Sequence, residues 1–171
     1  MKKVQLTLAL LIGLLALTTK CYSQSSSSEV VIGCFSGSTG ILGYSSAQLD
    51  IIVALYLQDG NNYTNSSLKY DVDEGGVGFF YIRSETTGQT IGIPLETTGT
   101  YIFVKDGCKH SCSSSGNCSC DLKIVTKCES IQCICATGTG GCSSSIETGY
   151  TTFGNTALIR YITENPPLSC N

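Results

Sequence analysis

Cysteine is the residue that most constrains what this chain can fold into. Eleven of its 171 residues are cysteine, and eight of the eleven lie between Cys108 and Cys142. Outside the reducing cytosol, cysteines at this density pair as disulfides, which stabilise folds that lack a large apolar core. We therefore expect covalent cross-links, rather than reactive thiols, to shape the C-terminal third of the chain.

The first 23 residues predict that the protein is exported. Lys2 and Lys3 precede an apolar run at 4–17 that is too short to span a bilayer comfortably, and Ser23 provides a small residue for cleavage. The alternative is lipoprotein processing at Cys21, although Lys20 stands where such sites have a small residue. Under both interpretations Cys21 leaves the pool of pairing thiols. We expect a secreted protein, either extracellular or at the cell surface.

The charge balance excludes some classes of partner. The formal net charge is −3 and only 13% of the residues are charged, against about 25% in average proteins. An acidic chain repels nucleic acid and anionic membranes, so we expect neither as a partner. No other apolar run approaches bilayer length, which predicts no membrane span. A surface rich in Ser, Thr, Gly and Tyr suits contact with the chain itself, with other extracellular proteins or with glycans.

The stretch 29–107 predicts an all-β, β-sandwich-like domain. Short runs rich in Ile, Val, Tyr, Phe and Thr are separated by clusters of Gly, Asn, Asp and Ser. We predict strands at about 30–35, 50–58, 69–72, 77–84, 90–94 and 99–105. The run 51–57 is apolar without alternation, which indicates a central strand covered on both faces. A helix over 47–57 is the alternative, because short apolar runs are ambiguous.

Residues 98–106 add one resemblance. Their sequence, Thr-Gly-Thr-Tyr-Ile-Phe-Val-Lys-Asp, resembles the late strand of immunoglobulin-like sandwiches, in which a Gly-x-Tyr corner precedes an alternating strand. The resemblance implies a sandwich architecture and no particular function.

The expected organisation has five parts. They are a signal peptide over 1–23, a disordered serine tract over 24–28, the β-sandwich-like domain over 29–107, a small disulfide-stapled β-hairpin module over 108–142, and a C-terminal strand and tail over 143–171 that packs back on the β-domain.

The cysteine spacing suggests a doubly linked hairpin. Cys118 and Cys120 are two residues apart, as are Cys133 and Cys135, so each pair projects from one face of a strand. A hairpin turning at 126–127 places Cys118 opposite Cys135 and Cys120 opposite Cys133, within disulfide range. This connectivity is one of many that the count allows.

Ten cysteines are candidates for disulfides. They are Cys34, Cys108, Cys112, Cys118, Cys120, Cys128, Cys133, Cys135, Cys142 and Cys170. If the eight clustered cysteines pair among themselves, Cys34 and Cys170 are left to pair with each other. Such a bond would join the first strand to the end of the chain and stabilise the fold by about 4 to 5 kcal/mol in the chain-entropy model.

Metal and cofactor sites are not expected. Zinc sites favour Cys-x-x-Cys spacing, which this chain lacks, and His110 is its one histidine. Asp59, Asp71 and Asp73 are weak candidates for calcium ligands, but Gly75 stands where an EF-hand loop needs an oxygen ligand. Solvated turns are the alternative interpretation of these carboxylates.

No catalytic motif occurs, so we predict that the protein is not an enzyme. A serine nucleophile would need His110 as its base, and we expect His110 to be an ordinary exposed polar residue. A secreted hydrolase is the alternative, with Asp50, Asp71, Asp73 or Glu96 as candidate carboxylates of a glycosidase.

Two asparagines are candidate glycosylation sites. Asn62 and Asn65 each begin an Asn-x-Ser/Thr sequence within one polar stretch. A third such sequence, at Asn117, has a cysteine in the middle and is a poor acceptor.

These features favour a secreted structural or adhesive protein, such as a matrix, coat or fibre subunit. It would act by non-covalent assembly of low-charge β surfaces on a disulfide-stabilised fold. The alternative is a secreted binding or effector protein, such as an inhibitor, toxin or glycan binder, that displays loops from a cystine scaffold.

Overall fold

The computed structural model describes residues 29–36, 40–104 and 107–167, and the fold of this part is all-β with two helices. The predicted signal peptide, the serine tract and Cys170 lie outside the described residues. The strands and helices are β1 Val30–Ser36, β2 Gly40–Gly43, α2 Ser46–Leu57, β3 Thr64–Val72, β4 Gly78–Thr86, β5 Gln89–Pro94, β6 Glu96–Thr98, β7 Tyr101–Val104, β8 Gly107–Gly116, β9 Ser119–Thr126, β10 Ser130–Thr137, β11 Gly140–Tyr150 and α3 Thr156–Glu164.

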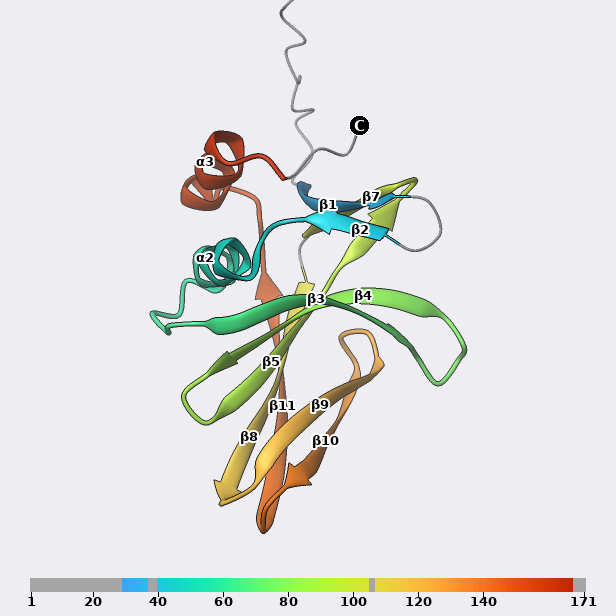
Figure 1. Cartoon of the computed structure of the whole chain (residues 1–171), viewed down its shortest axis with the longest axis vertical. Helices are drawn as coiled ribbons and strands as arrows, with labels where there is room; N and C mark the ends of the chain where they lie inside the picture. The colour runs from blue at the N-terminus through green and yellow to red at the C-terminus, as the bar shows by residue number, and fades with distance from the viewer. Residues whose placement is uncertain (1–28, 37–39, 105–106, 168–171) are drawn as a thin grey trace, which may run out of the picture.

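A five-stranded antiparallel sheet in the order β11-β8-β5-β4-β3 forms the centre of the molecule. A four-stranded sheet, β2-β1-β7-β6, lies at one end together with the two helices, and the β9–β10 hairpin lies at the other end (Figure 1). The chain crosses between the two larger sheets at Leu95, which follows the proline that ends β5 and is only 2% exposed. Pro94 therefore stands at a strand end, as its missing N–H requires.

The apolar run 51–57 is helical, so the predicted strand at 50–58 is wrong and the alternative is right. The side-chain carbonyl of Gln48 accepts the N–H of Ser45 at 3.0 Å, a contact typical of a helix start. The buried side chains recur at helical spacing and are Leu49, Ile52, Val53, Tyr56 and Leu57. Ile51, on the opposite face of α2, is 44% exposed. The helix covers one face of β3 and β4, which explains why its own sequence is so apolar.

Two apolar cores lie on opposite faces of the five-stranded sheet. The larger core joins the sheet to the helices and the four-stranded sheet, with Ile52, Ile82 and Ile102 fully buried. The smaller core joins the sheet to the β9–β10 hairpin through Leu122, Ile124 and buried cysteines. The sheet is thus covered on both faces over part of its area.

The cysteine-rich stretch shares a sheet with the strands before it. Strand β8 pairs with β5 on one side and with β11 on the other. After β11 the chain forms α3, which the sequence analysis did not predict. Asn155 begins this helix by accepting the N–H of Leu158 at 3.0 Å, and its amide donates to the Leu55 carbonyl of α2 at 2.8 Å. The side chain of Asn155 therefore joins the two helices.

Candidate functional site

Disulfides attach the β9–β10 hairpin to the five-stranded sheet. Among the described residues the bonds are Cys108–Cys128, Cys112–Cys133, Cys118–Cys135 and Cys120–Cys142. Three of the four join the hairpin to the sheet. Cys108–Cys128 joins β8 to the hairpin turn, Cys112–Cys133 joins β8 to β10, and Cys120–Cys142 joins β9 to β11. The fourth lies within the hairpin. The two strands β8 and β11 are therefore held rigidly against a covalently fixed layer.

One of the two predicted hairpin bonds is present. Cys118 pairs with Cys135, but the predicted Cys120–Cys133 bond is wrong, because Cys120 lies opposite Cys135 in the ladder and Cys133 lies opposite Leu122. The turn occupies 127–129 rather than 126–127, and a bulge after Cys135 brings it within reach of Cys118. The sulfurs of Cys120 and Cys133 consequently bond to the sheet instead of to each other.

Cys34 of β1 is 2% exposed and is also disulfide-bonded. Cys170, its expected partner, lies outside the described residues, so this pairing stays a prediction.

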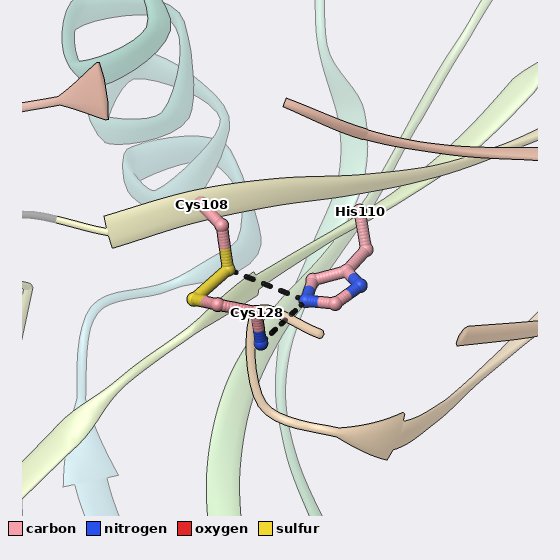
Figure 2. Close-up of side chains that lie close together, drawn as sticks. All are labelled: Cys108, His110 and Cys128. Carbon is pink, nitrogen blue, oxygen red and sulfur yellow. Dashed lines mark hydrogen bonds between the residues drawn. A yellow bond between two sulfur atoms is a disulfide. The ribbon is translucent and has the colours of Figure 1, made fainter. Parts of the chain in front are cut away.

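His110 is buried, so the expectation that it is exposed is wrong. Its exposed fraction is 0%, because the hairpin turn covers this part of β8. Figure 2 shows the ring beside the Cys108–Cys128 disulfide, with Nε2 directed toward it. Nε2 accepts the N–H of Cys128 at 3.2 Å and lies 3.3 Å from Sγ of Cys108. Because Nε2 is an acceptor, the proton of the neutral ring is on Nδ1, which is buried without a hydrogen-bond partner. Burial lowers the pKa of His110 to about 4.

Two groups of side chains in the described residues have the spacing of metal ligands. They are Cys108, His110 and Cys128, and Cys118, Cys120 and Cys142. Every sulfur in both groups belongs to a disulfide, so neither group offers a thiolate to a transition metal. His110 is likewise shielded from any substrate that a surface base would need to reach.

The calcium candidates are used locally and do not gather into one site within the part of the chain that the structure describes. Asp71 accepts the N–H of Val72 at 2.8 Å, and Asp73 accepts the N–H of Val77 at 2.7 Å in the β3–β4 turn. Both are local contacts with nearby backbone N–H groups, of the kind that Asp side chains make without a metal.

Asp59, the third candidate, lies apart from the β3–β4 turn and contacts Tyr63 and Lys109 instead. Its carboxylate accepts the Tyr63 hydroxyl at 2.6 Å and lies 3.5 Å from Nζ of Lys109. Burial works to raise the pKa of Asp59, but the bond from Tyr63 and further hydrogen bonds outweigh it, and the pKa is lowered.

The remaining glycosidase candidates also make structural contacts. Asp50 of α2 accepts the N–H of Ser66 at 2.9 Å, and Glu96 of β6 forms an ion pair with Lys127 at the hairpin turn. Asp50 therefore ties the helix to β3, and Glu96 ties the small sheet to the hairpin.

The two glycosylation candidates differ in their surroundings. Asn62 is exposed in the loop before β3. Asn65 is exposed on β3 in a left-handed conformation, with φ of 57°, and its Nδ2 donates to Glu85 at 2.9 Å. A glycan on Asn65 would displace that bond, so Asn62 is the more open acceptor.

The feature with the clearest potential for interaction is strand β11, an edge of the five-stranded sheet. It is 11 residues long and pairs with β8 without interruption from Gly140 to Thr148. Within the described ranges no strand pairs with its other side. Long edges of this kind offer a row of unpaired N–H and C=O groups to another chain.

The orientation of these groups follows from the neighbouring strand. Ser114 of β8 donates its N–H to the Gly88 carbonyl at 3.2 Å, on the side of β8 that faces β5. Because backbone groups alternate in direction along a strand, Ser113 directs its N–H and C=O toward β11, where its partner is Ser143. The N–H and C=O of the next residue, Ser144, therefore point to the open edge, and those of Ile146 do the same.

The charge on this edge forms an ion pair within the chain. Glu147 is the one charged residue of β11, and its carboxylate lies 3.0 Å from Nζ of Lys109 and accepts the Tyr150 hydroxyl at 2.8 Å. These two contacts hold the pKa of Glu147 below its ordinary value. Burial works to lower the pKa of Lys109, but its bonds to Glu147 and Tyr150 outweigh it, and the pKa of Lys109 is raised. The pair stays charged at neutral pH, and Lys109 shares its positive charge between Glu147 and Asp59.

Other sheet edges carry more protective features than β11, which has one charged residue, Glu147, and a bulge confined to its C-terminal end, between Thr148 and Tyr150. Strand β3, the opposite edge of the same sheet, has a bulge at Asn65 and carries Lys69 and Asp71. On β9, the side chain of Asp121 accepts the N–H of Leu122 at 3.0 Å. The uncharged strand β10 is shorter, at eight residues, and is interrupted by two bulges. Charges, bulges and side-chain caps all discourage edge pairing.

Comparison of the chain with protein-family models, with curated proteins and with solved structures found no match. The comparisons therefore add no support to the resemblance of 98–106 to an immunoglobulin-like strand. Neither helix of the described part has the length and apolar character needed to cross a membrane.

Proposed function

We propose that the protein is a secreted structural or adhesive subunit that assembles by pairing the open edge of β11 with β11 of a second copy. The observation that carries this proposal is the length of the strand and its unpaired outer side. The one carboxylate of the strand forms an ion pair with Lys109. Edges of this kind associate with other chains unless charge, proline or a bulge prevents it.

Self-pairing suits the sequence of the strand. In an antiparallel pairing centred on Ser145, Glu147 of one copy lies opposite Ser143 of the other, so like charges do not meet. Ser144 of one copy then lies opposite Ile146 of the other, and both residues direct their backbone groups outward. Each such pair can exchange two hydrogen bonds across the interface.

The disulfides support the same proposal. They hold β8 and β11 in place before a partner arrives, so association orders few additional groups and its entropic cost is low. Four disulfides in the described residues also favour an oxidising compartment, in agreement with the predicted export signal.

Sedimentation velocity of the oxidised protein over a range of concentrations tests this function. We expect the wild type to form dimers or larger species as the concentration rises. Ser144→Pro removes the outward N–H without breaking a bond to β8, and we expect it to remain monomeric. Ser144→Ala is the matched control, because it shortens the same side chain but keeps the N–H, and it should associate like the wild type. A wild type that stays monomeric at its highest soluble concentration would contradict the proposal, as would equal association of the proline variant.

A further inference from the structure

The β9–β10 hairpin leaves part of the sheet face beneath it uncovered. A hollow of about 460 Å³ lies between β9 and the strands β3 and β4, and its polar lining includes Lys69, Arg83, Ser119 and Asp121 with the ring of Tyr81. This volume is within the usual range of about 300–1,000 Å³ for small-molecule sites. The hollow is open to solvent.

A second hollow extends the first along β9. Its volume is about 190 Å³, and it shares Ser119 and Cys120 with the first hollow. Its own lining includes the hydroxyls of Thr86 and Ser114, the amide of Gln89 and the carboxylate of Glu85. We call the two adjoining hollows, which meet at Ser119 and Cys120, the β9 groove.

The positive charge of the β9 groove lies at one end. Arg83 is held in place by Glu85, 2.8 Å from its Nη1, and its Nε lies 3.7 Å from Asp121. Lys69 lies directly opposite Tyr81 in the β3–β4 ladder and is exposed. It makes no ion pair with any residue in the described part of the chain. One cation at this end of the groove is therefore available to a ligand.

We propose that the β9 groove binds an acidic oligosaccharide, with a sugar carboxylate on Lys69 and sugar hydroxyls on Asp121 and on the polar groups of the second hollow. A groove with hydroxyl, amide and carboxylate groups matches a chain of hydroxylated rings, and Lys69 supplies the charge-assisted bond that selects an acidic unit. A nucleic acid would need several cations rather than one.

Isothermal titration calorimetry with an oligogalacturonate, and with an uncharged cello-oligosaccharide of equal length, tests this site. We expect the oxidised protein to bind the acidic probe, and Lys69→Gln to weaken binding by about tenfold or more through loss of the charged contact. Lys69→Arg keeps the charge and should bind as the wild type does. Arg160→Gln removes the same charge from the exposed α3, where the side chain is 78% exposed, and should also leave binding unchanged.

Three results would overturn the assignment. They are no binding of the oligogalacturonate, equal binding of the uncharged probe, and equal weakening by the substitutions at Lys69 and Arg160. Because Lys69 is exposed, circular dichroism is expected to show an unchanged fold in its variants. The site is independent of β11, so Ser144→Pro should bind the acidic probe normally even though it blocks edge pairing.

Discussion

Nε2 of His110 accepts the backbone N–H of Cys128 at 3.2 Å, across the gap between β8 and the hairpin turn. Cys128 itself has a left-handed backbone, with φ of 57°, and is bonded through sulfur to Cys108 of β8. The turn is thus attached to the sheet by one covalent bond and one hydrogen bond from the same residue. Only the neutral imidazole can accept that hydrogen bond, so the contact depends on pH.

The free energy of unfolding should fall as the pH drops from about 6.5 toward 4. The pKa of His110 is about 4 in the folded protein and about 6.5 in an unfolded chain. The unfolded state therefore binds a proton first, and the stability that is present above pH 6.5 is lost as the pH falls. The pKa difference corresponds to about 3 kcal/mol. Urea unfolding of the oxidised protein at a series of pH values measures it.

The matched variant for this prediction is His110→Gln, which has a neutral side chain that can still accept the N–H of Cys128. It should lose the pH dependence between 6.5 and 5. Glu85 and Glu147 titrate lower, because hydrogen bonds hold the pKa of each below its ordinary value. An unchanged slope in the variant would show that His110 is not the group responsible.

Gly92→Ala should destabilise the packing of the hairpin on the sheet. A Cβ atom at this position would lie 3.0 Å from Leu122 and 3.3 Å from Ile124, both buried in the smaller core. We expect a loss of about 1–3 kcal/mol, as for other overpacked cores, measured by thermal or urea unfolding. Gly141→Ala is the control, because its Cβ would meet only the exposed Ser115 hydroxyl, at 3.3 Å, and no atom of either apolar core. Equal losses for both variants would contradict the close packing at Gly92.

Lys109→Met should leave the carboxylates of Asp59 and Glu147 without their cation. The Lys109 side chain is only 7% exposed, and the loss of a partly buried pair should destabilise the fold by about 1–3 kcal/mol. It should also weaken self-association, because Glu147 then brings an uncompensated charge to the open edge. The double variant Lys109→Met with Glu147→Gln should regain association. Failure of this rescue in sedimentation would argue against a role for charge compensation.

Peptide mapping of the unreduced protein should recover the links Cys108–Cys128, Cys112–Cys133, Cys118–Cys135 and Cys120–Cys142. A Cys120–Cys133 link would instead indicate the register expected from spacing alone, and extensive alkylation of the intact protein would contradict a disulfide scaffold altogether.

The all-β class and most strand positions could be predicted from the sequence, because alternating apolar runs and turn residues are local signals. The helical structure of 46–57 could not be predicted in the same way. Its apolar residues face a sheet on one side and a helix on another, so the run shows no clear helical or strand period. Which residues of the run are buried, as Ile52 is, and which are exposed, as Ile51 is, depends on packing against β3, β4 and α3, which the sequence of the run does not show.

The candidate site was less predictable than the fold. The spacing of Cys118 and Cys135 indicated their bond, but the partners of Cys120 and Cys133 depend on β8 and β11 lying beneath the hairpin. The burial of His110 has the same origin. One sequence feature could have indicated the open edge of β11. Residues 140–150 are rich in serine and glycine and contain a single charge, and the β8 segment has a similar composition.

Amide hydrogen exchange resolved by residue tests the proposed assembly most directly. The N–H groups of Ser143 and Ser145 face β8 and should be protected at every concentration, whereas those of Ser144 and Ile146 face the open edge and should become protected only as the concentration rises. Fast exchange of Ser144 and Ile146 under conditions in which the wild type sediments as a larger species would contradict pairing through β11.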